Sequence, residues 1–73
     1  MTVSQALEHA RARGLARLDA QVLLLHVLGQ TTHARAWLLT HDQDALTDAQ
    51  TTAYEHAVRR RVRQEPVAYI TGE

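Results

Sequence analysis

Apolar residues recur at spacings of three and four along most of the chain, the period of an amphipathic helix. No stretch alternates between apolar and polar residues in the way that a half-buried strand does. The pattern divides the sequence into four helices and a short fifth C-terminal helical turn. The predicted fold class is therefore all-α, a small bundle that forms a single helical domain over residues 1–73.

The first predicted helix covers residues 4–13 and has a complete start and stop signal. Thr2 and Gln5 have the spacing of a capping box, in which each side chain bonds the other residue's backbone amide. Gly14 is placed to end the helix. One face of the helix is apolar and is expected to be buried: Val3, Ala6, Leu7 and Ala10.

The second predicted helix, residues 17–28, contains the stretch "AQVLLLHVL" and ends before Gly29. A helix that is apolar nearly all round belongs at the centre of a bundle. His26 lies within this stretch, so we expect a buried histidine bonded to a carbonyl or to the surroundings of Asp19.

The third predicted helix covers residues 33–40, with Thr32 as its N-cap. Trp37 is the single tryptophan and is expected to anchor the core. Its truncation to alanine should then cost about 3–5 kcal/mol. The side of this helix predicted to face inward carries Ala34, Trp37, Leu38 and His41.

The fourth predicted helix starts at "LTDAQ", where Thr47 and Gln50 form a second capping box. Pro66 cannot continue this helix but can open another, and Gly72 can close it, so "PVAYITG" is expected to be a single helical turn. The inward stripe of the fourth helix is predicted to carry Tyr54, Ala57, Val58, Arg61 and Val62.

Length and composition limit what the chain can be. A domain of 73 residues buries about 60% of its unfolded surface, so its stability is modest. The sequence contains no cysteine, which excludes disulfides and thiolate metal sites and is typical of a reducing cytosol. Its apolar runs are shorter than the roughly 20 residues that a membrane span needs. We therefore expect a cytoplasmic protein without membrane partners.

Charges cancel overall but are sorted along the chain. Eight arginines balance eight acids, and lysine is absent. Residues 42–55 carry four acids and no base, whereas four arginines fall within residues 59–63. Acids at the start of a helix and bases at its end complement the helix dipole, and Glu55 with Arg59 has favourable i,i+4 spacing. The arginines therefore form either a solvated helix end or a patch that faces a partner.

No residue pattern indicates catalysis or metal binding. The five histidines do not pair at i,i+3 or i,i+4, as zinc ligands on one helix face would. The three glycines stand singly, where a phosphate loop clusters them. No catalytic, cofactor-binding or metal-binding residue is predicted. A helix-turn-helix fits poorly, because Leu25 and Arg35 stand where that motif needs a small and an apolar residue.

Three segments together resemble the N-terminal helical domain of the HemK/PrmC family of protein-glutamine methyltransferases, which modify peptide chain release factors. The segments are "RLDAQVLLLHVLG", "LTDAQ" and "EPVAYITG", and they have the order and spacing of that domain across almost the whole chain. The resemblance implies a parent enzyme that binds S-adenosylmethionine in a separate Rossmann-like domain. That domain methylates the glutamine of the release factor's Gly-Gly-Gln motif.

The family's Asn-Pro-Pro-Tyr motif and glycine-rich loop have no counterpart here, since the sequence has no asparagine and a single proline. The catalytic domain is therefore expected to be absent from this chain, and the chain alone to be inactive. Its expected partners are a release factor and that missing domain. Five residues near the expected junction are candidates for partner or interdomain contact: Arg59, Arg60, Arg63, Tyr69 and Ile70.

Two other functions are compatible with the sequence. A free-standing helical adaptor would have the same bundle and no enzymatic parent. A nucleic-acid-binding module would use the arginines and bind with steep salt dependence, although a net charge of zero argues against it.

Overall fold

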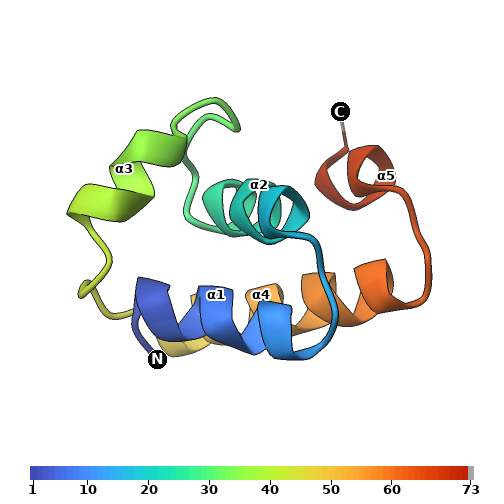
Figure 1. Cartoon of the computed structure of the whole chain (residues 1–73), viewed down its shortest axis with the longest axis horizontal. Helices are drawn as coiled ribbons and strands as arrows, with labels where there is room; N and C mark the ends of the chain where they lie inside the picture. The colour runs from blue at the N-terminus through green and yellow to red at the C-terminus, as the bar shows by residue number, and fades with distance from the viewer. Residues whose placement is uncertain (73) are drawn as a thin grey trace.

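The computed structural model describes residues 1–72 and forms five helices (Figure 1). The described part contains no strand beyond one isolated bridge. The all-α prediction is confirmed, and the boundaries of the first two helices agree with it to within one residue. The helices are α1 Val3–Ala12, α2 Arg17–Val27, α3 Arg35–Thr40, α4 Asp48–Val62 and α5 Val67–Thr71.

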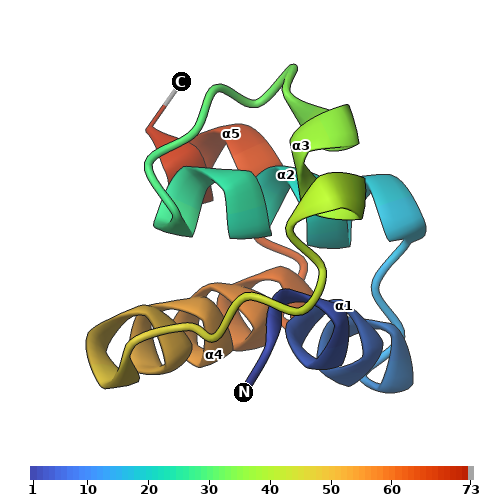
Figure 2. The same ribbon diagram turned by 90° about the vertical axis from the view of Figure 1, so that its left-hand side faces the viewer.

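Helix α2 occupies the centre of the molecule, as its apolar sequence predicts. It packs against each of the other four helices. Helices α1 and α4 form one layer, α2 lies across them, and α3 and α5 flank α2 on opposite sides (Figures 1 and 2). The buried side of α2 is covered from several directions. This helix contributes more fully buried leucines than any other: Leu23, Leu24 and Leu25.

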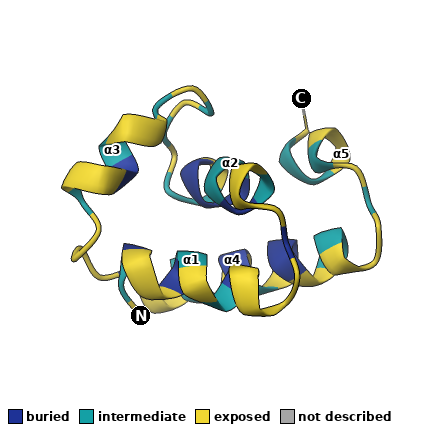
Figure 3. Cartoon of the chain, viewed as in Figure 1, coloured by how far each residue is buried: buried dark blue, intermediate teal, exposed yellow. Residues whose placement is uncertain are grey.

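The core lies where α1, α2 and α4 meet, and the buried surfaces of these helices face one another (Figure 3). Tyr54 on α4 is the largest fully buried side chain, with 0% of its surface exposed. Its hydroxyl donates a hydrogen bond of 3.0 Å to the carbonyl oxygen of Ala20 on α2. The bond joins residues 34 positions apart and satisfies a buried polar group that would otherwise be costly.

Burial raises the pKa of Tyr54 well above its ordinary value of 10.0. The unfolded chain ionises this phenol near pH 10, whereas the folded chain keeps it protonated, so the folded state binds more protons above that pH. The contribution of the Tyr54 phenol to the free energy of unfolding is therefore fully present below about pH 10. Above that pH it falls by about 1.4 kcal/mol per pH unit. Urea denaturation between about pH 9.5 and 11.5 should show this decline, and Tyr54→Phe should flatten it. An equally steep decline in Tyr54→Phe would contradict the assignment.

Both predicted capping boxes are present. In α1 the Thr2 amide donates to Gln5 Oε1 at 2.8 Å, and the Gln5 amide donates to Thr2 Oγ1 at 3.1 Å. In α4 the corresponding distances between Thr47 and Gln50 are 2.9 and 3.1 Å. Each box satisfies two backbone amides that the first helical turn leaves without a partner.

The loop before α4 crosses the start of α1, a contact for which the sequence contains no local signal. The amides of Val3 and Ser4 donate to the carbonyls of Asp44 and Asp42, each at 2.9 Å. The Leu46 amide donates to the Met1 carbonyl at 2.8 Å. These three bonds fasten the N-terminus to the segment that leads into α4 and complete the hydrogen bonding of the first turn of α1.

The chain reverses after α4 through Gln64, a non-glycine residue with a φ of 73°. The amide of Glu65 returns to the carbonyl of Arg60, and that of Gln64 to Arg61, which is the pattern of a Schellman motif. Pro66 then opens α5 and Gly72 closes it in the left-handed region, as predicted. This turn directs α5 back onto α2 and α4.

The third helix differs from its prediction. It begins after Ala34, Thr32 makes no capping bond, and the preceding residues form a turn in which the Ala34 amide donates to the Thr31 carbonyl. Leu38 is the buried residue of α3, whereas Trp37 is only partly buried and its ring stacks on His41 at 3.9 Å. Successive helical residues point about 100° apart, so with Leu38 directed into the core the indole of Trp37 lies at the core edge.

Three further side-chain predictions are wrong. His26 is exposed, because α2 is covered on its Leu23–Leu25 side and not on the side that carries His26. Val62 is also exposed, because α4 extends beyond the helices that cover its middle. Glu55 and Arg59 form no ion pair among the described residues, so solvent holds both groups despite their i,i+4 spacing.

Candidate functional site

The α4–α5 junction carries the arginines and the short helix that the sequence singles out. Successive helical residues point about 100° apart, so the arginines cannot share one face. Arg59 and Arg63 are exposed. Arg60 is paired with Glu65 in the turn before α5, through its Nε. Of the three candidate arginines, two are therefore open to a partner and one is engaged within the junction.

Arg61 has a structural contact that was not predicted, although its place at the edge of the inward stripe was. Its Nε lies 3.0 Å from Oδ2 of Asp19 on α2, and both side chains are largely covered. Asp19 and Arg61 are 42 positions apart, so neither local spacing nor composition identifies the pair. The contact ties the C-terminal half of α4 to the start of α2.

Helix α5 divides the remaining two candidates. Ile70 packs against the core together with Val67, whereas Tyr69 projects outward with 76% of its surface exposed. Exposed tyrosines offer a large apolar ring with a polar tip, which suits a protein contact. The outward part of the junction therefore consists of Arg59, Arg63 and Tyr69.

A cavity of about 290 Å³ lies between α2, α4 and α5, beside this junction. Two histidines from different helices, His26 and His56, line it together with Arg60 and Ile70. Their meeting is a product of the fold, since they stand 30 positions apart in the sequence. No group of three or more His, Asp or Glu side chains within residues 1–72 is arranged to hold a metal ion.

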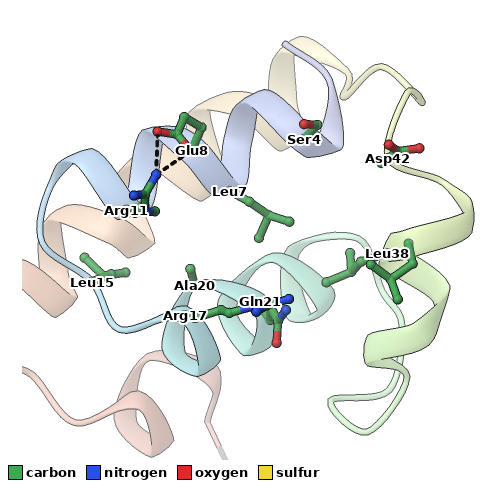
Figure 4. Close-up of a pocket in the computed structure, with 11 residues that line it drawn as sticks. Ser4, Leu7, Glu8, Arg11, Leu15, Arg17, Ala20, Gln21, Leu38 and Asp42 are labelled. Atoms are coloured by element: carbon green, nitrogen blue, oxygen red, sulfur yellow. Dashed lines mark hydrogen bonds and ion pairs between the residues drawn. The ribbon is translucent and has the colours of Figure 1, made fainter.

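A larger groove of about 570 Å³ lies between α1, α2 and α3, and it was not predicted from the sequence. Leu7 and Leu38 point into it, and Arg17 and Gln21 of α2 lie along it (Figure 4). The one sequence signal for it is Leu39, an apolar residue outside the predicted inward side of the third helix.

None of the described helices has the length and apolar character needed to cross a membrane. The fold and its surfaces thus define a small all-helical domain whose exposed features are a cationic junction and an apolar groove. The chain belongs to the PrmC N-terminal domain family, whose pattern it matches over residues 2–72. The resemblance drawn from the three sequence segments is confirmed.

Curated relatives are named "Release factor glutamine methyltransferase". The Bordetella pertussis protein is 46% identical over 59 residues, which is 81% of this chain and 21% of the relative. A Xylella fastidiosa protein is 42% identical over 67 residues, covering 92% of this chain and 23% of the relative. The Escherichia coli protein is 34% identical over 68 residues, covering 93% and 24%. The chain thus spans about a fifth to a quarter of these relatives, and no solved structure matches it.

Proposed function

We propose that this chain is the N-terminal domain of a cytoplasmic release factor glutamine methyltransferase, in which it helps to recognise the release factor or to position the catalytic domain. The observation that carries the proposal is the family match over residues 2–72, together with relatives that are about four times longer. In the parent enzyme, S-adenosylmethionine supplies the methyl group, and the acceptor is the side-chain amide nitrogen of the glutamine in the Gly-Gly-Gln motif.

The chemistry of this reaction supports a division of labour between domains. An amide nitrogen is a poor nucleophile because its lone pair is delocalised, so it must be held close to the methyl donor by fixed hydrogen-bond acceptors. In this family the Asn-Pro-Pro-Tyr motif of the catalytic domain provides those acceptors. This chain has no asparagine and therefore lacks the motif. A rigid helical bundle contributes to such a reaction by fixing the relative positions of two protein surfaces.

The α4–α5 junction is the proposed contact with the catalytic domain. Tyr69, Arg59 and Arg63 present one aromatic ring and two guanidinium groups to that neighbour. Arg60 and Ile70 support the same surface from within, through the Glu65 pair and the core contacts of α5. Arginine and tyrosine are enriched at protein interfaces, which favours this use of the surface.

The proposal is tested with the catalytic part of the Bordetella pertussis relative, prepared alone and with this chain joined in place of its own N-terminal segment. Methyl transfer is measured with intact release factor and with a short Gly-Gly-Gln peptide. Joining the chain should raise kcat/KM for intact release factor by about tenfold or more, equivalent to about 1.4 kcal/mol, and leave the peptide reaction nearly unchanged.

This chain alone should transfer no methyl group to either substrate. Turnover by the isolated chain, or equal kcat/KM for intact release factor with and without it, would overturn the proposal. A matched control joins the chain carrying Tyr54→Ala, whose unfolded bundle should give no gain.

A further inference from the structure

Two leucines on neighbouring helices are exposed to a degree that needs an explanation. Leu18 of α2 is 51% exposed and Leu39 of α3 is 72% exposed. They line one shallow depression of about 540 Å³ together with Ala36, Gln21, Arg17 and Arg35, a set that we call the α2–α3 patch. Single exposed leucines are ordinary, but two that share a depression form an apolar contact surface.

The α2–α3 patch opens into the groove between α1, α2 and α3. Arg17, Gln21 and Leu39 line both, so the two depressions form one continuous surface. Leu7 and Leu38 supply the deeper apolar wall of the groove (Figure 4). A shallow apolar entrance leading to a deeper apolar channel is the shape in which proteins receive an amphipathic segment of a partner.

The charges along this surface favour an acidic occupant. The two charged residues of the patch are both arginines, Arg17 and Arg35, and neither forms an ion pair within residues 1–72. Within the groove, Glu8 pairs with Arg11 at 3.1 Å, and Asp42 lines the groove without an ion pair among residues 1–72, so the uncompensated positive charge of this surface lies on the patch. Carboxylates of a partner that lie over the patch would therefore meet two uncompensated guanidinium groups.

The combination of features points to a protein and not to a nucleic acid. A phosphate backbone would pair with the arginines but would leave Leu18 and Leu39 against water or against charge. The chain as a whole also carries no net positive charge to attract a polyanion. A peptide segment with apolar and acidic residues satisfies both the leucines and the arginines.

We propose that the α2–α3 patch and the adjoining groove are the docking surface for an apolar, acidic segment of the release factor. This inference rests on the proposed function and adds the surface and the chemistry of the segment. The patch includes α3, which lies at the end of the molecule opposite α5 (Figure 1). The domain thus holds the release factor through one end and the catalytic domain through the α4–α5 junction at the other.

The test is a titration of the ¹⁵N-labelled chain with purified release factor, followed by amide NMR spectra that detect even weak binding. The amide signals of residues 17–21 and 35–39 should shift or broaden first.

Leu39→Asp and Arg35→Glu alter exposed side chains, so both variants should keep the fold, which thermal melts verify. Each should weaken binding by about tenfold or more, as loss of an anchor residue or a charge contact does. Matched controls at the other end, Tyr69→Asp and Arg63→Glu, should stay within about twofold of the parent.

Four other outcomes would contradict the docking proposal, and each points to a different explanation. If release factor binds and Leu39→Asp binds equally well, the docking surface is wrong and the proposed function stands. If Tyr69→Asp abolishes binding instead, the α4–α5 junction is the docking surface. Absence of any binding by the parent chain removes both this inference and a recognition role. A concentration-dependent dimer that Leu39→Asp disrupts would assign the patch to a second copy of the chain.

Discussion

Replacing Tyr54 with alanine is expected to unfold most of the domain at 25 °C. The substitution removes the largest fully buried side chain at the meeting point of α2 and α4. Truncating a buried aromatic residue costs about 3–5 kcal/mol, through lost burial and the cavity that remains. The hydrogen bond of the Tyr54 hydroxyl to the Ala20 carbonyl is also lost, which adds about 0.5–1.5 kcal/mol, because that carbonyl keeps its bond within α2. A domain of this size has little more stability than that sum.

Far-UV circular dichroism and urea denaturation measure this effect directly. The matched control is Trp37→Ala, which removes a larger ring that is only partly buried. Because less of its surface leaves water on folding, it should cost at least about 1.5 kcal/mol less than Tyr54→Ala. Equal destabilisation by the two variants would show that Trp37 anchors the core, as the sequence predicts.

Replacing Leu38 with alanine is expected to release α3 from the bundle while the other helices stay folded. Helix α3 has six residues, and Leu38 is its one fully buried side chain. Truncation of a buried leucine costs about 2–5 kcal/mol. A helix this short has no independent stability to offset that loss, so local detachment needs less free energy than global unfolding.

Trp37 reports on this detachment because it lies on α3 and stacks on His41. In Leu38→Ala its fluorescence should change at lower urea concentration than the far-UV signal, whereas the parent shows one transition for both. Leu39→Ala is the control, since Leu39 is largely exposed and its loss should change stability by no more than about 0.5 kcal/mol. Coincident transitions in Leu38→Ala would show that α3 unfolds only with the rest.

The features that were predicted correctly depend on local chemistry. A capping box needs only two residues three positions apart, so the starts of α1 and α4 are readable from Thr2 and Thr47. The central place of α2 follows from its apolar composition, because a helix with so little polar surface must be covered by others. Local patterns therefore predict the helices and the fold class.

The features that were missed depend on which helices meet. Trp37 and Tyr54 both lie on predicted inward faces, and only the arrangement of α2 against α4 decides which ring is fully buried. His26 is exposed because α2, though mostly apolar, is left uncovered on that side.

The candidate sites show the same limit. The α4–α5 junction could be chosen as a candidate contact surface because the arginine run and the proline are visible in the sequence. Two arginines of the run form ion pairs, Arg60 with Glu65 and Arg61 with Asp19, and the others are exposed. Only the folded structure shows which arginines are paired. The α2–α3 patch joins residues from two helices, so no single stretch of sequence reveals it.

The bonds between the N-terminus and residues 42–46 also constrain the order of events during synthesis. Ser4, Val3 and the Met1 carbonyl obtain their partners only after Asp42, Asp44 and Leu46, respectively, have left the ribosome. Helices α1 and α2 emerge earlier and can associate while the first amides of α1 are still bonded to water. The beginning of the nascent polypeptide therefore reaches its final geometry only after more than half of the chain has been translated, although it is translated first.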